Sequence, residues 1–289
     1  MKIRKAVITA AGWGTRFLPA TKSQPKEMLP LVDKPIIQYV IEEAAASGIE
    51  HIIIVTALGK HAIENHFDRS FELEDVLRRK GDDKRLEEVQ RISDIAHICY
   101  VRQKEQLGLG HAVSMAKDLV GNEPFALFLP DDLIASEVPA MKQMIEVYDR
   151  YGCSIIAVEP VPPEKTSAYG IINPKQIEER VFQVTDLVEK PSPEDAPSNL
   201  GIVGRYILTP EIFDMFDNVS PGAVGEIQLT DALRLLLKHQ AIYAYQFEGT
   251  RHDTGEPLGF LKACVEYTLK RPDLGPAFKE YLKQLYITD

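Results

Sequence analysis

The sequence has little cysteine and no long apolar run, and these absences exclude several classes of protein. Its three cysteines, Cys99, Cys153 and Cys264, are too few and too far apart for a disulfide framework or a cysteine-ligated metal site. No apolar stretch approaches the roughly 18 residues that a membrane-spanning helix needs, and no signal-peptide pattern follows Met1. We therefore expect a cytoplasmic protein with reduced thiols and no membrane partner.

The sequence also lacks a positive charge balance. Its 33 Lys and Arg residues are outnumbered by 43 Asp and Glu residues, which gives a formal net charge of −10. Nucleic acids attract basic surfaces, so this balance argues against a general nucleic-acid partner. A small polyphosphate is still possible as a ligand, because a local cluster of Lys, Arg and backbone N–H groups can bind an anion on an acidic protein.

Short apolar runs alternate with helical patterns in the first half of the chain. A helix is predicted over residues 35–47, a second over 60–68, and the charged stretch 72–91 predicts a solvated helical excursion because it lacks a wide apolar stripe. This alternation of strand and helix favours an α/β fold, with a Rossmann-like, mostly parallel central sheet and helices on both faces. The strands predicted here are residues 6–9, 51–56, 98–101 and 125–129.

The second half has longer connections and more proline. Its predicted strands are residues 181–189, 202–208 and 241–247, which we interpret as a smaller β subdomain continuous with the first core. No Gly/Ser-rich linker separates independent domains. We therefore expect one domain over residues 1–289, with halves of about 1–135 and 136–289.

A glycine-rich loop follows the first predicted strand, so a dinucleotide-binding loop must be considered. That fingerprint, G-x-G-x-x-G, would begin at Gly12 and Gly14, but its third position is Phe17. Prolines recur from Pro19 to Pro35 and keep the chain irregular where the helix of a dinucleotide fold should begin. A nicotinamide-dependent oxidoreductase is therefore disfavoured, and no P-loop motif occurs either.

The same loop is suited to bind phosphates. Its small residues let backbone N–H groups approach a phosphate closely, Arg16 adds a planar multidentate cation, and Lys26 adds a point charge. A tight turn with two solvated cations is the alternative. The candidate phosphate-binding residues are Ala10, Ala11, Gly12, Gly14, Thr15, Arg16 and Lys26.

The pattern from Gly12 to Arg16, followed by Lys-Glu-Met-Leu-Pro at residues 26–30, resembles the signature of the sugar-phosphate nucleotidyltransferases. Within that family it is most similar to the bacterial UTP–glucose-1-phosphate uridylyltransferases. The resemblance implies the nucleotide-diphospho-sugar transferase fold, with a nucleotide-binding first half and a sugar-phosphate-binding second half.

Carboxylates follow two of the predicted strands. Asp131 and Asp132 stand at the end of a central strand, where Mg²⁺ could take one or two carboxylates together with phosphate oxygens; a turn or a helix cap is the alternative. The resemblance assigns the metal to Asp131 and implies that Asp132 does not bind it directly but lies behind Asp131 or in the turn. It also makes Asp253 the second Mg²⁺ ligand, although Asp-x-Gly alone is an ordinary turn.

Further candidates are expected at the base and at the sugar. The amide of Gln103 can both donate and accept, which suits a pyrimidine edge, and Gly108 would let a base pack near the backbone, although a helix start with incidental glycines reads equally well. The resemblance gives base recognition to both residues, and we interpret His111 as a packing residue.

Glu189-Lys190-Pro191 and Gly170 are the sugar-side candidates, although exposed Glu-Lys pairs are commonplace. Neighbouring strand residues point to opposite faces, so Glu189 and Lys190 can serve one pocket only if the strand ends or bends there. The resemblance makes Glu-Lys-Pro the sugar-phosphate motif and Gly170 a backbone donor to a sugar hydroxyl. The string from Gly225 to Ala232 reads as a capped helix start and supports the resemblance without assigned roles.

The activity implied is transfer of UMP from UTP to glucose 1-phosphate by Mg²⁺-assisted in-line attack, yielding UDP-glucose and pyrophosphate. Arg16 and Lys26 would hold the leaving phosphates and Lys190 the attacking one. Two alternatives stay open: a sister enzyme that uses dTTP or another hexose 1-phosphate, and a non-catalytic nucleotide-sugar sensor. The family commonly forms homo-oligomers, so we expect a dimer or tetramer.

Overall fold

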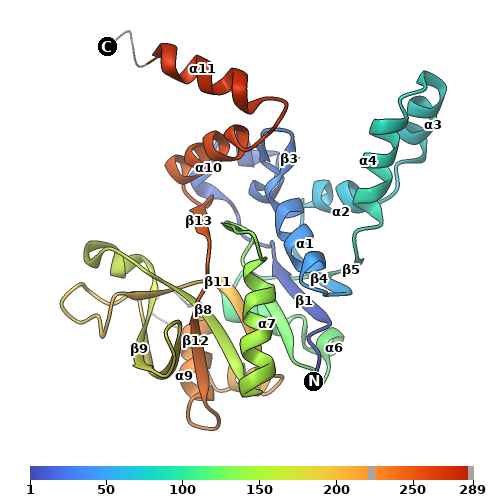
Figure 1. Cartoon of the computed structure of the whole chain (residues 1–289). Helices are drawn as coiled ribbons and strands as arrows, with labels where there is room; N and C mark the ends of the chain where they lie inside the picture. Colours follow the sequence, from blue (N-terminus) through green and yellow to red (C-terminus); the bar gives the residue numbers. More distant parts are fainter. Residues whose placement is uncertain (221–224, 286–289) are drawn as a thin grey trace.

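A computed structural model describes residues 1–220 and 225–285 of the chain (Figure 1). A nine-stranded sheet runs through it in the order β5-β4-β1-β6-β11-β8-β12-β10-β9, and two two-stranded sheets, β13-β7 and β2-β3, accompany it. The strands are β1 (Lys5–Thr9), β2 (Pro30–Leu31), β3 (Lys34–Pro35), β4 (His51–Thr56), β5 (His97–Arg102), β6 (Phe125–Phe128), β7 (Asp132–Ala135), β8 (Ser154–Pro160), β9 (Gly170–Gln176), β10 (Val181–Glu189), β11 (Leu200–Leu208), β12 (Ile242–Gln246) and β13 (Thr250–Asp253).

Helices cover both faces of the large sheet. The α-helices are α1 (Ile36–Ala46), α2 (His61–Phe67), α3 (Phe71–Lys80), α4 (Asp83–Ser93), α5 (Leu109–Ser114), α6 (Lys117–Val120), α7 (Ala140–Tyr151), α8 (Ile212–Phe216), α9 (Leu229–Leu236), α10 (Pro257–Leu269) and α11 (Gly275–Leu285). Four short 3-10 helices lie in the loops: η1 (Thr15–Phe17), η2 (Ala20–Lys22), η3 (Lys26–Met28) and η4 (Pro163–Ala168). No helix within the described ranges is long and apolar enough to span a bilayer.

The sheet divides the apolar interior into two cores, as the alternation of side chains along a strand requires. Ala6 and Ile8 of β1 pack on the side of α1 and α7, whereas Val7 packs on the side of α5, α8 and α9. Both cores are built mainly from buried aliphatic side chains, together with aromatic residues such as Phe128 in one and Phe125 in the other. The expected cover of helices on both faces is therefore confirmed.

The expectation of a mostly parallel sheet is wrong. The strands β5, β4, β1 and β6 are parallel, but β11 pairs antiparallel with both β6 and β8, and β10 pairs antiparallel with β12 and β9. Only β12 with β8 adds a further parallel pair to this sheet. The sugar-side strands extend the same sheet from β11 onward, so they are continuous with the first core, as predicted.

Most element bounds agree with the sequence. The strands at 51–56 and 181–189 have the predicted limits, and the strand around residue 100 runs from His97 to Arg102. The string from Gly225 to Ala232 differs: the helix begins only at Leu229, and its N-cap residue Gln228 makes no side-chain capping bond. The described chain has no disulfide, and the three cysteines are free, with Cys99 exposed.

The charged excursion consists of two helices, α3 and α4, that project from the body beyond α2 (Figure 1). It is not solvated throughout, because Glu74 of α3 is fully buried. Its carboxylate accepts hydrogen bonds from Arg69, Arg78 and, on α4, Gln90. These donors hold the pKa of Glu74 at about 2, Arg69 contributing most. A paired carboxylate thus joins two helices that have little apolar surface between them.

A buried ion pair ties the sheet to α1 beneath the carboxyl end of β6. The Arg205 side chain of β11 is fully buried, and its Nη2 lies 2.7 Å from Oε2 of Glu43, whose carboxylate also accepts from Arg205 Nε. Nη1 of Arg205 donates to the carbonyl oxygens of Leu129 and Gly204. The guanidinium therefore fixes the chain where β6 ends and β11 passes it.

We predict that Glu43→Ala lowers the free energy of unfolding by about 3–5 kcal/mol, because it leaves the Arg205 charge buried without a partner. Urea denaturation of the purified protein measures this. Asp214→Ala is the control: it removes an exposed pair with Lys117 and should cost less than about 1 kcal/mol. Equal losses in the two variants would contradict the role assigned to the buried pair.

Candidate active site

Two pockets adjoin at the carboxyl ends of β1 and β6, and they share Leu109, Leu129, Asp131 and Glu226. The loop pocket is lined by residues 11–15 together with Lys26, Glu27, Gln103 and Gly108. The sheet pocket is lined by Arg16, Gly170, Glu189, Lys190 and Arg251, among others. Residues predicted to bind a nucleotide and residues predicted to bind a sugar phosphate thus lie on either side of Asp131.

The glycine-rich loop has no helix at its end, as the prolines predicted, and continues through η1 to η3. Gly14 has a left-handed conformation (φ 67°), and a Cβ there would lie only 3.2 Å from the Cβ of Lys26. The absence of a side chain at Gly14 therefore lets Lys26 fold back against the loop. Behind Lys26, the buried Glu27 pairs with Lys60 of the β4–α2 connection at 2.8 Å, which fixes η3 in place.

Two predicted phosphate-binding residues lie apart from the loop pocket. Ala10 is fully buried, and its N–H donates to the carbonyl oxygen of Val55, so it supports the loop from below. The Arg16 side chain lines the sheet pocket and is largely exposed, with Nε 3.2 Å from Glu256. The remaining residues of this set, Ala11, Gly12, Gly14, Thr15 and Lys26, line the loop pocket.

Lys26 and Asp131 form an ion pair of 2.6 Å at the junction of the pockets. Burial acts to raise the pKa of Asp131, but the neighbouring Lys26 ammonium outweighs it and holds this pKa below its ordinary value. Burial likewise acts to lower the pKa of Lys26, and Asp131 keeps it raised. Both groups are thus charged at neutral pH.

Asp131 and Asp253 converge on one glycine. A Cβ at Gly255 would lie 2.9 Å from Oδ2 of Asp131 and 3.1 Å from Oδ1 of Asp253, so only glycine leaves room for both carboxylates. Thr254 holds the two segments together, because its N–H and its hydroxyl both donate to the Asp131 carbonyl oxygen. Asp253 is the last residue of β13, so the expected place just after a strand is off by one residue.

Gln103 is buried at the far end of the loop pocket. Its amide nitrogen donates to the carbonyl oxygen of Gly108 (3.2 Å) and lies 2.9 Å from Nδ1 of His111. His111 was expected to be a packing residue, but it also orients this amide. Gly108 has φ 97°, and a Cβ there would lie 2.8 Å from the carbonyl oxygen of Ile227, so the chain passes very close to it.

Glu189 and Lys190 do serve one pocket, as the bend hypothesis required. β10 ends at Glu189, and Lys190 has φ 47°, a left-handed conformation that turns its side chain to the same side. Nζ of Lys190 lies 3.2 Å from Oε1 of Glu189, and the Thr230 hydroxyl donates to Oε2 of Glu189 at 2.6 Å. Gly170 lies against these groups, since its Cβ would be 3.3 Å from Oε2 of Glu189.

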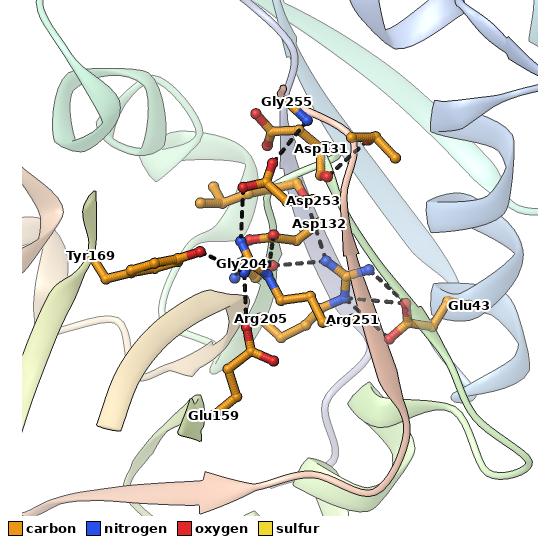
Figure 2. Close-up of polar contacts among 12 residues, drawn as sticks. Glu43, Asp131, Asp132, Glu159, Tyr169, Gly204, Arg205, Arg251, Asp253 and Gly255 are labelled. Carbon is orange, nitrogen blue, oxygen red and sulfur yellow. Dashed lines mark hydrogen bonds and ion pairs between the residues drawn. The ribbon is translucent and has the colours of Figure 1, made fainter. Parts of the chain in front are cut away.

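The sequence analysis missed Arg251, which lines the sheet pocket. Figure 2 shows its guanidinium among the side chains that surround it. Its guanidinium donates to Asp132, Glu159 and the Tyr169 hydroxyl, and it pairs with Asp253. Burial raises the pKa of Asp132 and of Glu159, with Arg251 opposing the rise in both. Residues two apart on a strand share a face, so β13 places Arg251 beside Asp253, but no strand was predicted there.

The comparisons with known proteins agree with this arrangement. Residues 5–270 match the family described as Nucleotidyl transferase. A curated UTP–glucose-1-phosphate uridylyltransferase of Staphylococcus epidermidis is 55% identical over 286 residues, which cover 99% of each chain. A UDP-glucose pyrophosphorylase solved in complex with UDP-glucose is 47% identical, with a TM-score of 0.86, and the match covers 93% of this chain and 100% of that one.

A second solved structure, a UTP-bound UGPase from Acinetobacter baumannii, is 43% identical, with a TM-score of 0.92 and coverage of 98% and 99% of the two chains. These likenesses extend over both pockets and the whole sheet. The chain belongs to the nucleotidyl transferase family, in the group of the bacterial UTP–glucose-1-phosphate uridylyltransferases.

Proposed function

We propose that the protein transfers UMP from UTP to glucose 1-phosphate and releases UDP-glucose and pyrophosphate. The observation that carries this proposal is the junction at Asp131, where a phosphate-binding loop and the Glu189–Lys190 pocket meet. Such a junction is what a reaction between two phosphorylated substrates needs. The named activity of relatives with 55% identity supports the choice of UTP and glucose 1-phosphate.

In this proposal the loop pocket holds UTP. Backbone N–H groups of Ala11 to Thr15 face the phosphates, with Ala10 supporting them from below, and Gln103 and Gly108 bind the base. Lys26 holds the leaving β and γ phosphates together with Arg16, whose Nη1 lies 3.5 Å from the carbonyl oxygen of Gly255 at the junction of the two pockets. Lys26 is paired with Asp131 in the structure. When UTP binds, an ion pair between Lys26 and a phosphate therefore has to replace the pair between Lys26 and Asp131.

The sheet pocket holds glucose 1-phosphate. Glu189 accepts hydrogen bonds from sugar hydroxyls, Gly170 donates its N–H to another, and Lys190 binds the attacking phosphate. Glu189 is fixed by Thr230, so its second oxygen stands beside the Lys190 ammonium. Glucose 1-phosphate carries hydroxyls and a phosphate on one sugar ring. The adjacent Glu189 carboxylate and Lys190 ammonium can bind a hydroxyl and the phosphate, respectively.

The donor set at Gly255 fits a magnesium ion. Mg²⁺ takes one or two carboxylates and fills its remaining positions with water and phosphate oxygens, and Asp131 and Asp253 converge there. No cluster of three or more His, Cys, Asp or Glu side chains that could hold a metal occurs in the described part of the chain, which suits an ion completed by substrate oxygens. When bound, Mg²⁺ would neutralise phosphate charge at the reacting centre.

The chemistry then needs no general base. A sugar phosphate oxygen is ionised at neutral pH, and it attacks the α-phosphorus in line while pyrophosphate leaves. The obstacle is the repulsion between two polyanions, so the protein contributes position and positive charge. Lys190 brings the nucleophile in, and Arg16 and Lys26 stabilise the charge that builds on the leaving group.

The rivals differ in what they bind or release. A sister enzyme would prefer dTTP or another hexose 1-phosphate, and a nucleotide-sugar sensor would release no pyrophosphate. Arg16 and Lys26 speak against a sensor, which has no use for a leaving-group clamp. Pyrophosphate release over a panel of nucleoside triphosphates and sugar 1-phosphates with Mg²⁺ separates them all. The expected cytoplasmic location and dimeric or tetrameric assembly stay predictions.

We predict that Lys190→Ala lowers turnover about 10²–10³-fold while the protein stays folded, because the attacking phosphate loses its cation. Steady-state pyrophosphate release measures the loss, and circular dichroism checks the fold. Lys175→Ala, an exposed lysine on the neighbouring β9, is the matched control and should behave as the unaltered protein. Turnover of Lys190→Ala near that of the control would remove Lys190 from the mechanism.

We also predict that Asp131→Asn abolishes the activity or its dependence on Mg²⁺. The amide keeps the shape of the side chain but loses the charge that an ion and Lys26 both use. A Mg²⁺ titration of pyrophosphate release measures this, with the exposed Asp149→Asn on α7 as control. An unchanged titration curve for Asp131→Asn would refute the metal assignment.

A further inference from the structure

Arg251 lies beside the candidate metal ligand Asp253 and is itself part of the lining of the sheet pocket. Its side chain is only 9% exposed, and it contacts three carboxylates and one hydroxyl that come from different elements. Figure 2 shows these acceptors around one guanidinium. A planar group with five N–H donors can bind all of them in fixed directions, which a lysine ammonium cannot do.

One end of Arg251 is anchored to the centre of the sheet. Nε donates to Oδ1 of Asp132, and Oδ2 of Asp132 accepts the backbone N–H of Gly204 at 2.7 Å. A Cβ at Gly204 would lie 2.6 Å from the Leu129 Cβ and 2.7 Å from Oδ2 of Asp132, so β11 can approach only with glycine. Asp132 is therefore fully used in holding Arg251 to β11.

The other end of Arg251 reaches the two sides of the site. Nη1 donates to the Tyr169 hydroxyl at 3.0 Å and to Oε1 of Glu159 at 2.8 Å, and Nη2 lies 3.5 Å from Oδ2 of Asp253. Tyr169 belongs to the sugar side, because it precedes Gly170 and its carbonyl oxygen accepts the N–H of Lys190 at 2.9 Å. The same guanidinium thus contacts Tyr169, which hydrogen-bonds Lys190, and the carboxylate of Asp253.

We propose that Arg251 is a positioning residue of the reaction, which sets Asp253 and the Tyr169–Lys190 wall at one fixed separation. The inference rests on the proposed function, since it concerns the alignment of the sugar phosphate with the metal-binding carboxylates. Arg251 acts through its neighbours. Asp132 holds the Arg251 guanidinium in place through its bond to the Gly204 N–H. The contacts from Nη1 to Tyr169 and from Nη2 to Asp253 then fix where these two residues lie.

The test is Arg251→Lys, which keeps the positive charge and removes the planar guanidinium with its several N–H donors. Calorimetry in EDTA gives the Kd of UDP-glucose, which fills both pockets, and of UTP, which binds at the loop pocket. We expect the Kd of UDP-glucose to rise about 10-fold or more and that of UTP to change little. In kinetics with Mg²⁺, the KM of glucose 1-phosphate should rise and kcat should fall.

Arg205→Lys is the matched control, because Arg205 is also a buried, forked arginine and contributes to neither pocket wall in the described chain. It should lower the melting temperature and leave the ratio of the two Kd values unchanged. The same behaviour in Arg251→Lys would show a merely structural residue and overturn the proposal.

If Arg251→Lys does not fold, Glu159→Gln decides. Glu159 contributes nothing to either pocket wall within the described chain, and the hydrogen bond that connects it to the site is the one from Arg251. A smaller rise of the UDP-glucose Kd alone supports the proposal, and an unchanged Kd refutes it. Wild-type protein that releases no pyrophosphate with any substrate pair would instead refute the proposed function.

Discussion

The constraint on which the site depends is an excess of carboxylates in a small, partly buried volume. Four of them, Asp131, Asp132, Glu159 and Asp253, are held together by two cations, Lys26 and Arg251. Carboxylates this close repel each other and lose hydration, so each is tied to a cation or a backbone N–H. Two glycines complete the arrangement, because Gly204 admits Asp132 to β11 and Gly255 admits the pair of Asp131 and Asp253. The negative charge left over is what a divalent cation can use.

The chain reaches this arrangement by joining two kinds of sheet. A parallel set of strands brings the glycine-rich loop, Gln103 and Asp131 to one edge, as expected where parallel strands end. From β11 onward the pairing is largely antiparallel, and β10 and β9 carry Glu189, Lys190 and Gly170 to the neighbouring pocket. The buried Arg205–Glu43 pair lies under the join. Nucleotide side and sugar side are therefore parts of one hydrogen-bonded surface.

Local features of this protein could be read from the sequence, and long-range ones could not. The strand at 51–56 is an apolar run between Gly48 and Gly59, and the strand at 181–189 ends shortly before Pro191, so these limits agree with the local sequence. Pro191 accounts for the end of β10 at Glu189, but not for the left-handed φ of Lys190, because a residue before proline favours extended backbone. Strand direction does not follow, because β11 lies beside β6 only through contacts more than 70 residues apart in the chain. Arg251 was missed for the same reason: its acceptors come from β7, from β8, from Tyr169 beside η4 and from β13, and they meet only in the folded chain.

The direct pairing of β11 with β6 has a consequence for motion. Hinged enzymes close by rotating two lobes about a flexible connection, but here four ladder positions from Arg205 to Leu208 bond the two halves across the middle of the sheet. A rotation would break that ladder and the buried arginine pair beneath it. The distance between the two pockets is therefore set when the chain folds.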